Sequence, residues 1–138
     1  MSSADMCAFC HLQGEVYFEN DLAKAFLSDP RKVKGHFLVT PKRHVEKPWE
    51  VTDEELRAVF KLIYKVEQKL IPTLGTGVDI RQNYRPFLEE SRLKIDHIHF
   101  HVIPRQKLDH IHEVAERYET VLFEKLTDQE REEIEKLL

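Results

Sequence analysis

Three histidines alternate with large apolar residues between Asp96 and Arg105. Alternation with a period of two is typical of a β-strand with one buried face, and we predict such a strand over residues 97–103. One face of this strand would consist of His97, His99 and His101. The other face would consist of Ile98, Phe100 and Val102. The apolar face can be buried against a helix. Three imidazoles in the remaining cleft indicate metal binding, anion binding, or proton and phosphoryl chemistry.

The rest of the chain has the pattern of short strands around one long helix. Thr52 and Glu55 form a capping box, and apolar residues follow at helical spacing, which predicts a helix that begins at Thr52 and is ended by Pro72. A second capping box, at Thr127 and Glu130, predicts a short C-terminal helix, and helix is also the better interpretation of residues 111–126. Further strands are predicted over residues 15–18, 22–27, 37–40 and 78–83, with a polar loop over 84–94. This order predicts an α+β domain with an antiparallel sheet.

Length and composition limit the classes of protein to consider. The 138 residues are predicted to form a single domain, 1–138, and 41% hydrophobic with 33% charged residues is typical of a soluble globular protein. A net charge of −4 gives no argument for nucleic-acid binding. No apolar run reaches the roughly 18 residues of a membrane span. Residues 1–5 lack the features of a signal peptide, so we expect a cytoplasmic protein with no membrane partner.

Three motifs together resemble the histidine triad (HIT) family, in its bacterial type with an N-terminal Cys-x-x-Cys. They are His97-Ile98-His99-Phe100-His101-Val102-Ile103, Gly35-His36-Phe37-Leu38-Val39-Thr40-Pro41-Lys42-Arg43-His44 and Cys7-Ala8-Phe9-Cys10. The resemblance implies a HIT-like five-stranded antiparallel sheet backed by one long helix. It also implies a homodimer in which two sheets form one continuous sheet.

The resemblance implies a nucleotide hydrolase that works through a covalent nucleotidyl-histidine intermediate. His99, the middle histidine, would attack the α-phosphorus of a dinucleoside polyphosphate, a nucleoside phosphoramidate or another adenylate. The backbone carbonyl of His97 would orient His99, and His101 would contact the phosphate or the leaving group. His36 matches the fourth active-site histidine of the family and is expected beside His97.

The family also implies groups that hold the nucleotide substrate. An amide side chain on the neighbouring strand binds phosphate, and strand parity favours Asn83 over Gln82 for this role. Ser28 stands where the ribose-binding carboxylate is usual, with Asp29 next to it. Arg92-Leu93-Lys94 replaces the usual Gly-Gln-Ser or Gly-Gln-Thr, so Lys94, Arg92 or Arg85 would supply charge to a polyphosphate, or would be solvated loop residues. An apolar base pocket is expected from residues such as Phe18, Phe26 and Leu27.

Two cysteines three positions apart form a poor disulfide framework and a better metal or redox pair. Through the resemblance, Cys7 and Cys10 would bind structural zinc together with His44 and His97. The alternative is a free cysteine pair. His110 and His112 are given no role.

Other functions fit the motifs less well. A catalytic metal site made by the three histidines is known in larger folds, which need far more strands or βα units than this chain offers. Within the family, a nucleotidylyltransferase or phosphorylase would use phosphate or a sugar phosphate in place of water. A non-catalytic nucleotide-binding module would keep the same cleft, although binding alone does not require a nucleophile.

Overall fold

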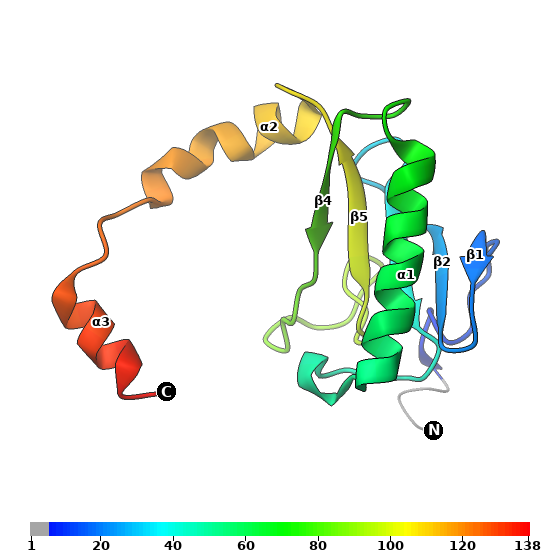
Figure 1. The fold of residues 1–138 in the computed structure, drawn as a ribbon, viewed down its shortest axis with the longest axis horizontal. Helices are drawn as coiled ribbons and strands as arrows, with labels where there is room; N and C mark the ends of the chain where they lie inside the picture. The colour runs from blue at the N-terminus through cyan, green and yellow to red at the C-terminus, as the bar shows by residue number, and fades with distance from the viewer. Residues whose placement is uncertain (1–5) are drawn as a thin grey trace. The chain divides into compact units, whose positions relative to one another are not determined.

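A computed structural model describes residues 6–138, and the chain divides into two compact units, the first ending at Gln106 and the second spanning Lys107–Leu138. The first unit is a five-stranded antiparallel sheet with one long helix packed on it (Figure 1). Its elements are β1 (Phe18–Glu19), β2 (Ala23–Leu27), β3 (Phe37–Pro41), the 3-10 turn η2 (Pro48–Glu50), α1 (Asp53–Leu70), β4 (Gly77–Arg81) and β5 (Phe100–Arg105). This architecture confirms the predicted α+β fold class.

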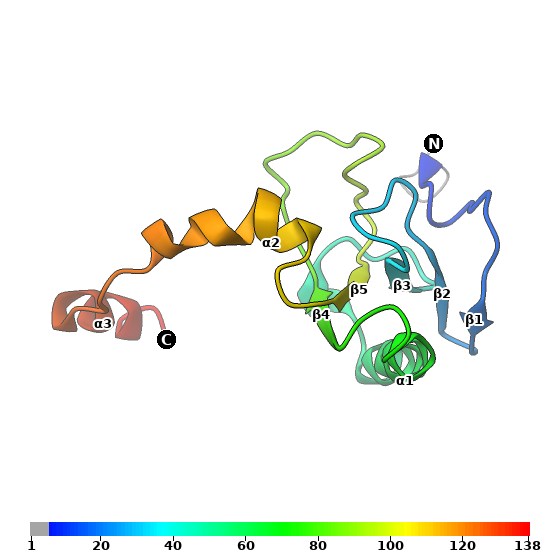
Figure 2. The same cartoon turned by 90° about the horizontal axis from the view of Figure 1, so that it is seen from above.

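The strand order in the sheet is β1-β2-β3-β5-β4, so β3 lies at the centre. The register places Leu38 of β3 and Arg81 of β4 directly opposite His101 of β5, one on each side. The helix lies on one side of the sheet, and the loop between β4 and β5 lies on the other (Figure 2). The side of the sheet away from α1 is called the cleft face below.

The helix α1 begins where the capping box predicts. The Thr52 hydroxyl accepts a hydrogen bond from the Glu55 backbone N–H, and the Glu55 carboxylate accepts one from the Thr52 backbone N–H. The buried stripe of the helix packs on alternate residues of the central strands, and this core consists of Val59, Leu62, Ile63 and Val66 with Ala23, Ala25, Phe37, Val39 and Val102. Burial of these apolar side chains holds the helix on the sheet.

The side chains at the other alternate positions of the strands lie on the cleft face. A second, smaller cluster on this side joins Cys7 and Phe9 to Phe26 of β2 and Leu38 of β3. His36 precedes Leu38 by two residues and therefore shares its face. The N-terminal Cys-x-x-Cys segment thus packs beside the histidine triad, although more than eighty residues separate the two motifs in the sequence.

Several predicted strand bounds are wrong. The last strand begins at Phe100 rather than at residue 97, because the Ile98 backbone N–H donates to the Val45 carbonyl at 2.6 Å and not to a strand of the sheet. His97 and His99 therefore lie in the segment leading into β5, and only His101 is within it. The strand β4 ends at Arg81, so Asn83 follows the sheet. The first strand is reduced to Phe18–Glu19.

The second unit is helical. It contains α2 (His110–Val114), the 3-10 segment η3 (Glu116–Leu122) and α3 (Asp128–Glu135). The Thr127–Glu130 capping box is present as predicted, and the helix expected over 111–126 is a short α-helix followed by 3-10 turns that end at Leu122. No helix of residues 6–138 is both long enough and apolar enough to cross a membrane. The single domain 1–138 stays a prediction.

Candidate active site and metal centre

His99 is held by one backbone hydrogen bond that defines its reactive nitrogen. Its Nδ1 lies 2.7 Å from the carbonyl oxygen of His97. A carbonyl only accepts, so Nδ1 carries the proton and the neutral ring keeps a lone pair on Nε2. This is the tautomer that a histidine nucleophile requires.

The ring of His99 is also fixed by packing. Phe9 contacts it edge to face, with ring centroids 5.1 Å apart and planes at 83°. Phe9 also packs edge to face on Phe26, with centroids 5.3 Å apart. An edge-to-face arrangement is favourable for aromatic rings, so the N-terminal segment supports the orientation that the carbonyl of His97 imposes.

His99 and His101 line two cavities at the same time. The larger, of about 780 Å³, has an apolar wall that includes Phe9, Phe26 and Leu38. The smaller, of about 370 Å³, lies toward the loop between β4 and β5. A group bonded to both a nucleoside and a leaving group can therefore sit at the histidines with one part in each cavity.

His101 and His36 form a second, separate pair. His36 Nδ1 accepts the Lys32 backbone N–H at 3.1 Å, so its Nε2 carries the proton and donates to His101 Nδ1 at 2.8 Å. The remaining nitrogen of His101, Nε2, is then the protonated one. The expectation that His36 lies beside His97 is wrong, because β3 pairs with β5 in a register that brings His36 to His101.

A turn before β3 sets the position of His36. Gly35 has a φ of +86°, which glycine adopts without strain. A Cβ at Gly35 would lie 2.7 Å from Leu74 Cδ1 and 3.3 Å from Pro104 Cγ. The glycine that precedes His36 is therefore required by both conformation and space.

Burial keeps these imidazoles neutral. Desolvation, followed by the charges of Lys32 and Arg81, lowers the pKa of His36 to about 4. Desolvation, followed by His99, His36, Lys32 and Arg81, lowers the pKa of His101 to about 3. Desolvation also lowers the pKa of His99, while the hydrogen bond that its Nδ1 donates to the His97 carbonyl acts in the opposite direction. The site therefore holds neutral imidazoles at pH 7.

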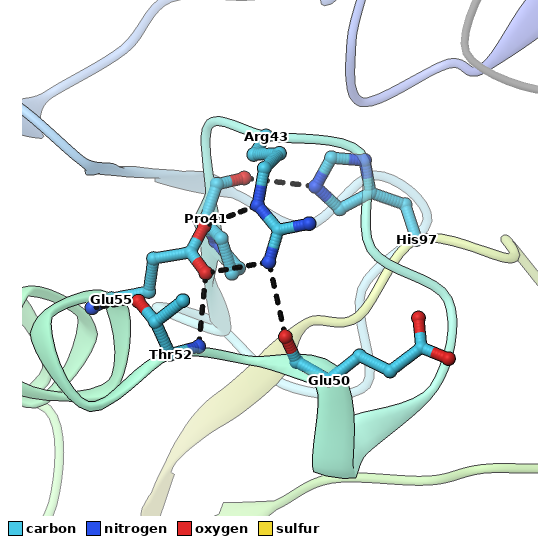
Figure 3. Close-up of polar contacts among 6 residues, drawn as sticks. All are labelled: Pro41, Arg43, Glu50, Thr52, Glu55 and His97. Carbon is cyan, nitrogen blue, oxygen red and sulfur yellow. Dashed lines mark hydrogen bonds and ion pairs between the residues drawn. The ribbon is translucent and has the colours of Figure 1, made fainter.

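The side chain of His97 belongs to a different group. It is 1% exposed, and its Nε2 donates to the Pro41 carbonyl at 2.8 Å (Figure 3). This bond leaves Nδ1 as the lone-pair nitrogen, and Nδ1 lies 3.5 Å from the sulfur atoms of both Cys7 and Cys10. His97 thus serves the triad through its backbone and the cysteines through its ring.

Four ligand atoms converge at this point. Cys7, Cys10, His44 and His97 place one sulfur or nitrogen each within 4.8 Å of one another. His44 presents Nδ1, which lies 3.4 Å from Cys10 Sγ, while its Nε2 contacts the Glu46 carboxylate at 3.2 Å. In each of the two imidazoles, the second ring nitrogen contacts an oxygen atom. Two thiols and two such imidazoles have the composition of a structural Cys₂His₂ zinc site. The predicted metal ligands therefore fit a metal ion.

Local contacts at the end of β3 hold the segment that carries His44. The Arg43 guanidinium binds both oxygens of the buried Glu55 carboxylate, at 3.0 and 2.8 Å, and also binds the Glu50 carbonyl (Figure 3). The capping residue of α1 is thus tied to the chain between Pro41 and His44. The contacts between Arg43 and Glu55 therefore hold both the start of α1 and the segment that leads to His44.

The four predicted substrate-binding residues divide between the two cavities. Ser28 and Asp29 line the larger one, and the Ser28 hydroxyl donates to the Pro30 carbonyl. Asn83 and Lys94 line the smaller one, where Lys94 forms an ion pair with Asp96. Of the base-pocket candidates, Phe26 and Leu27 line the larger cavity. Phe18 is wrong for this role, because it packs against the core under α1.

The family comparison agrees with this geometry. The family model of the HIT domain matches residues 11–108, which is more than half of the chain. The chain belongs to the HIT family. The matched residues include the triad and the Arg92-Leu93-Lys94 segment, whereas Cys7 and Cys10 lie just before them.

Several curated proteins resemble this HIT chain. An uncharacterised HIT-like protein of Methanocaldococcus jannaschii is 33% identical over 109 residues, which cover 75% of the chain and 82% of that protein. The adenosine 5′-monophosphoramidase of Schizosaccharomyces pombe is 33% identical over 72% of the chain and 74% of the enzyme. The asymmetrical bis(5′-nucleosyl)-tetraphosphatase of the same yeast is 29% identical over 69% of the chain but only 51% of its own length.

Solved structures show the same HIT fold. A protein of Streptococcus mutans superposes with a TM-score of 0.67 at 26% identity, covering 94% of this chain and 83% of that one. A HIT family member of Bacillus subtilis superposes with a TM-score of 0.63 at 23% identity, covering 88% and 98%. The second likeness concerns the fold alone.

Proposed function

We propose that this HIT protein is a nucleotide hydrolase that cleaves at the α-phosphate of a nucleotide conjugate through a nucleotidyl-His99 intermediate. The observation that carries the proposal is the 2.7 Å hydrogen bond from His99 Nδ1 to the His97 carbonyl, which leaves Nε2 as the lone-pair nitrogen. The two cavities that meet at His99 provide separate room for a nucleoside and a leaving group.

In the first step His99 Nε2 forms a bond to the α-phosphorus. The bond from phosphorus to the leaving group breaks, and the departing atom takes its electron pair. His101, with its proton on Nε2, donates a hydrogen bond to the departing atom or to a phosphate oxygen. Water then attacks the same phosphorus and loses a proton to solvent, while the P–N bond breaks and its electron pair returns to His99 Nε2. The nucleoside monophosphate is released.

The substrate's polar groups would be held on both sides of the histidines. The larger cavity offers an apolar wall for the base, with Ser28 and Asp29 for the ribose. Asn83 and Lys94 would contact phosphate oxygens from the smaller cavity. The names of the two yeast relatives, a phosphoramidase and a tetraphosphatase, support a nucleotide conjugate as the substrate class.

We also propose that Cys7, Cys10, His44 and His97 hold a structural zinc ion. Four protein ligands fill a tetrahedral zinc and leave no open position for a substrate. Zinc would supply rigidity: it would fix His97, whose carbonyl orients His99. The reacting groups are the histidines themselves.

The experiment that tests the function is rapid quenching of the protein during turnover of an adenylate panel. We expect a mass increase of one adenylyl group on the peptide that carries His99, lost in acid as a phosphoramidate is. A product formed with added inorganic phosphate in place of water would instead indicate a phosphorylase. Steady turnover of the panel without any adduct would contradict the covalent route.

A further inference from the structure

The loop between β4 and β5, on the cleft side of the sheet (Figure 2), contains a hydrogen-bonded turn at residues 91–94. The Ser91 backbone N–H donates to the Lys94 carbonyl at 2.9 Å, and the Lys94 N–H donates to the Ser91 carbonyl at 3.2 Å. The Ser91 hydroxyl also accepts the Leu93 backbone N–H at 3.1 Å. These bonds define the conformation of the two residues at the tip, Arg92 and Leu93, without any ligand.

The residues that follow the tip connect this turn to the wall of the larger cavity. Ile95 packs against the smaller apolar cluster of the cleft face, which also provides Phe9 and Phe26 to that wall. Lys94, in the turn itself, forms an ion pair with Asp96. The 91–94 turn is therefore held at a defined position beside the cavity.

Leu93 at the tip of the turn lines both cavities and is nevertheless 75% exposed. His99 and His101 line the same two cavities, so Leu93 borders the space that a nucleotide conjugate would fill in the proposed reaction. A large apolar side chain that the backbone holds in water gains free energy when an apolar group covers it. Leu93 is thus an apolar contact surface that belongs to the site and has no role yet.

The base is the part of a nucleotide that can cover Leu93. The ribose and the phosphates are polar, whereas a base has two aromatic faces. The larger cavity already offers an apolar wall from the N-terminal segment and the strands, which includes Phe9 and Phe26. Leu93 adds an apolar contact from a different segment, the loop between β4 and β5. Because hydrogen bonds already fix the turn, little conformational entropy is lost when the ligand binds.

We infer that the 91–94 turn is part of the nucleoside site and that Leu93 packs on the base of the bound nucleotide, as a specificity-determining residue. The inference rests on the proposed function. Leu93 takes no part in bond making at phosphorus, so its contact is the same in the substrate, the transition state and the product. Its loss should therefore raise KM and leave kcat nearly unchanged.

Calorimetry with AMP and with ribose 5-phosphate, which is AMP without its base, tests the contact without turnover. We expect Leu93→Ala to weaken AMP binding by about 5- to 20-fold, the loss expected for a partly covered leucine, and to leave ribose 5-phosphate binding unchanged. Leu93→Met keeps an apolar side chain of similar volume and should bind AMP within about twofold of the wild type. For an adenylate that the wild type hydrolyses, Leu93→Ala should raise KM by a similar factor.

Phe87→Ala is the matched control. Phe87 belongs to the same loop and is 79% exposed, but it lines neither cavity. Its replacement should leave the affinities for AMP and for ribose 5-phosphate as in the wild type. A loss in Leu93→Ala that Phe87→Ala does not share therefore belongs to the position of Leu93, and not to a disturbed loop.

Three results would overturn the inference. They are unchanged AMP binding in Leu93→Ala, equal losses for AMP and ribose 5-phosphate, and a wild-type protein that binds AMP no more tightly than ribose 5-phosphate. In each case the nucleotidyl adduct on His99 decides the proposed function separately. A loss specific to AMP in a protein that turns over adenylates without an adduct would keep the nucleoside site and refute the covalent route.

Discussion

A single backbone carbonyl decides which nitrogen of His99 can react. Because the carbonyl of His97 accepts a hydrogen bond from Nδ1, the lone pair must be on Nε2. The same residue uses its ring for another purpose, among Cys7, Cys10 and His44. His97 therefore links the nucleophile to the metal cluster, because its backbone carbonyl orients His99 and its imidazole lies among the cluster residues.

Replacement of His99 by alanine tests the nucleophile. We expect His99→Ala to lower kcat by about 10³-fold or more, because the covalent route is lost and not one contact. KM should change much less, since Asn83 and the cavity walls remain. His101→Ala, for comparison, should lower kcat by about 10²–10⁴-fold, as for a group that assists the leaving atom. Near-normal turnover by His99→Ala would show that another group attacks the phosphorus.

The buried imidazoles predict a dependence of stability on pH. An unfolded histidine titrates near pH 6.5, whereas the pKa values of His36 and His101 are about 4 and about 3 in the folded chain. As pH falls below 6.5, the unfolded chain gains protons that the folded chain does not. The free energy of unfolding should therefore be highest above pH 6.5 and should decline toward pH 4.

Urea denaturation between pH 4 and pH 8 measures this decline. Carboxylates also titrate near the lower limit, so His36→Gln serves as the control. This variant should show a shallower slope than the wild type between pH 6.5 and pH 4. Identical slopes would mean that His36 is not held neutral by burial.

At the scale of elements, two segments far apart in sequence support one cluster. The Cys7–Cys10 segment packs on Phe26 and Leu38, and the Pro41–His44 segment is tied to the start of α1 through Arg43 and Glu55. Burial, and after it the neighbouring Cys7, raises the pKa of the Cys10 thiol to about 11. A cation is what would stabilise the thiolate there.

Replacement of Cys10 tests the metal. We expect about one zinc per chain in the wild type, and for Cys10→Ser a loss of zinc together with an unfolding temperature lower by about 5 °C or more. Metal analysis and thermal denaturation measure the two effects. His11→Gln is the control, because His11 is exposed and lies outside the cluster. Wild-type protein purified without chelators that contains no zinc would contradict the assignment.

At the scale of the whole molecule, the sheet of the first unit ends in a strand with an unpaired side. Within residues 6–138 the strand β4 pairs only with β5, and Ile80 on it is 39% exposed. An open edge is a site where another strand can add, and pairing with a second copy of the chain would cover it.

We expect a homodimer in solution. Light scattering at micromolar concentration should give twice the chain mass of 16.4 kDa. Ile80→Lys places a charge at the exposed edge and should shift the mass toward that of one chain. Lys61→Glu is a charge-changing control that should keep the dimer, because Lys61 lies on α1 near the β1–β2 turn, toward the other edge of the sheet. A wild-type mass of one chain would refute the prediction.

Most of the fold follows from local patterns. The capping box at Thr52 and Glu55 predicts the start of α1, and the alternation of apolar residues separates a helix face from a cleft face. The strand ends were predicted less well. Nothing in the order of residues 97–103 shows that Ile98 bonds to Val45 and so delays β5 until Phe100.

The candidate site, like the fold, could be predicted only in part from the sequence. The sequence by itself determined the residue types that the chemistry needs, the histidine triad and the Cys-x-x-Cys, because these lie close together along the chain. Only the tertiary structure decided that His36 meets His101, that Phe9 packs on His99, and that Lys32 lines the larger cavity together with His99 and His101. Strand register and loop packing act between residues distant in sequence, and a hydrogen bond or charge contact exists only once they have brought the partners together.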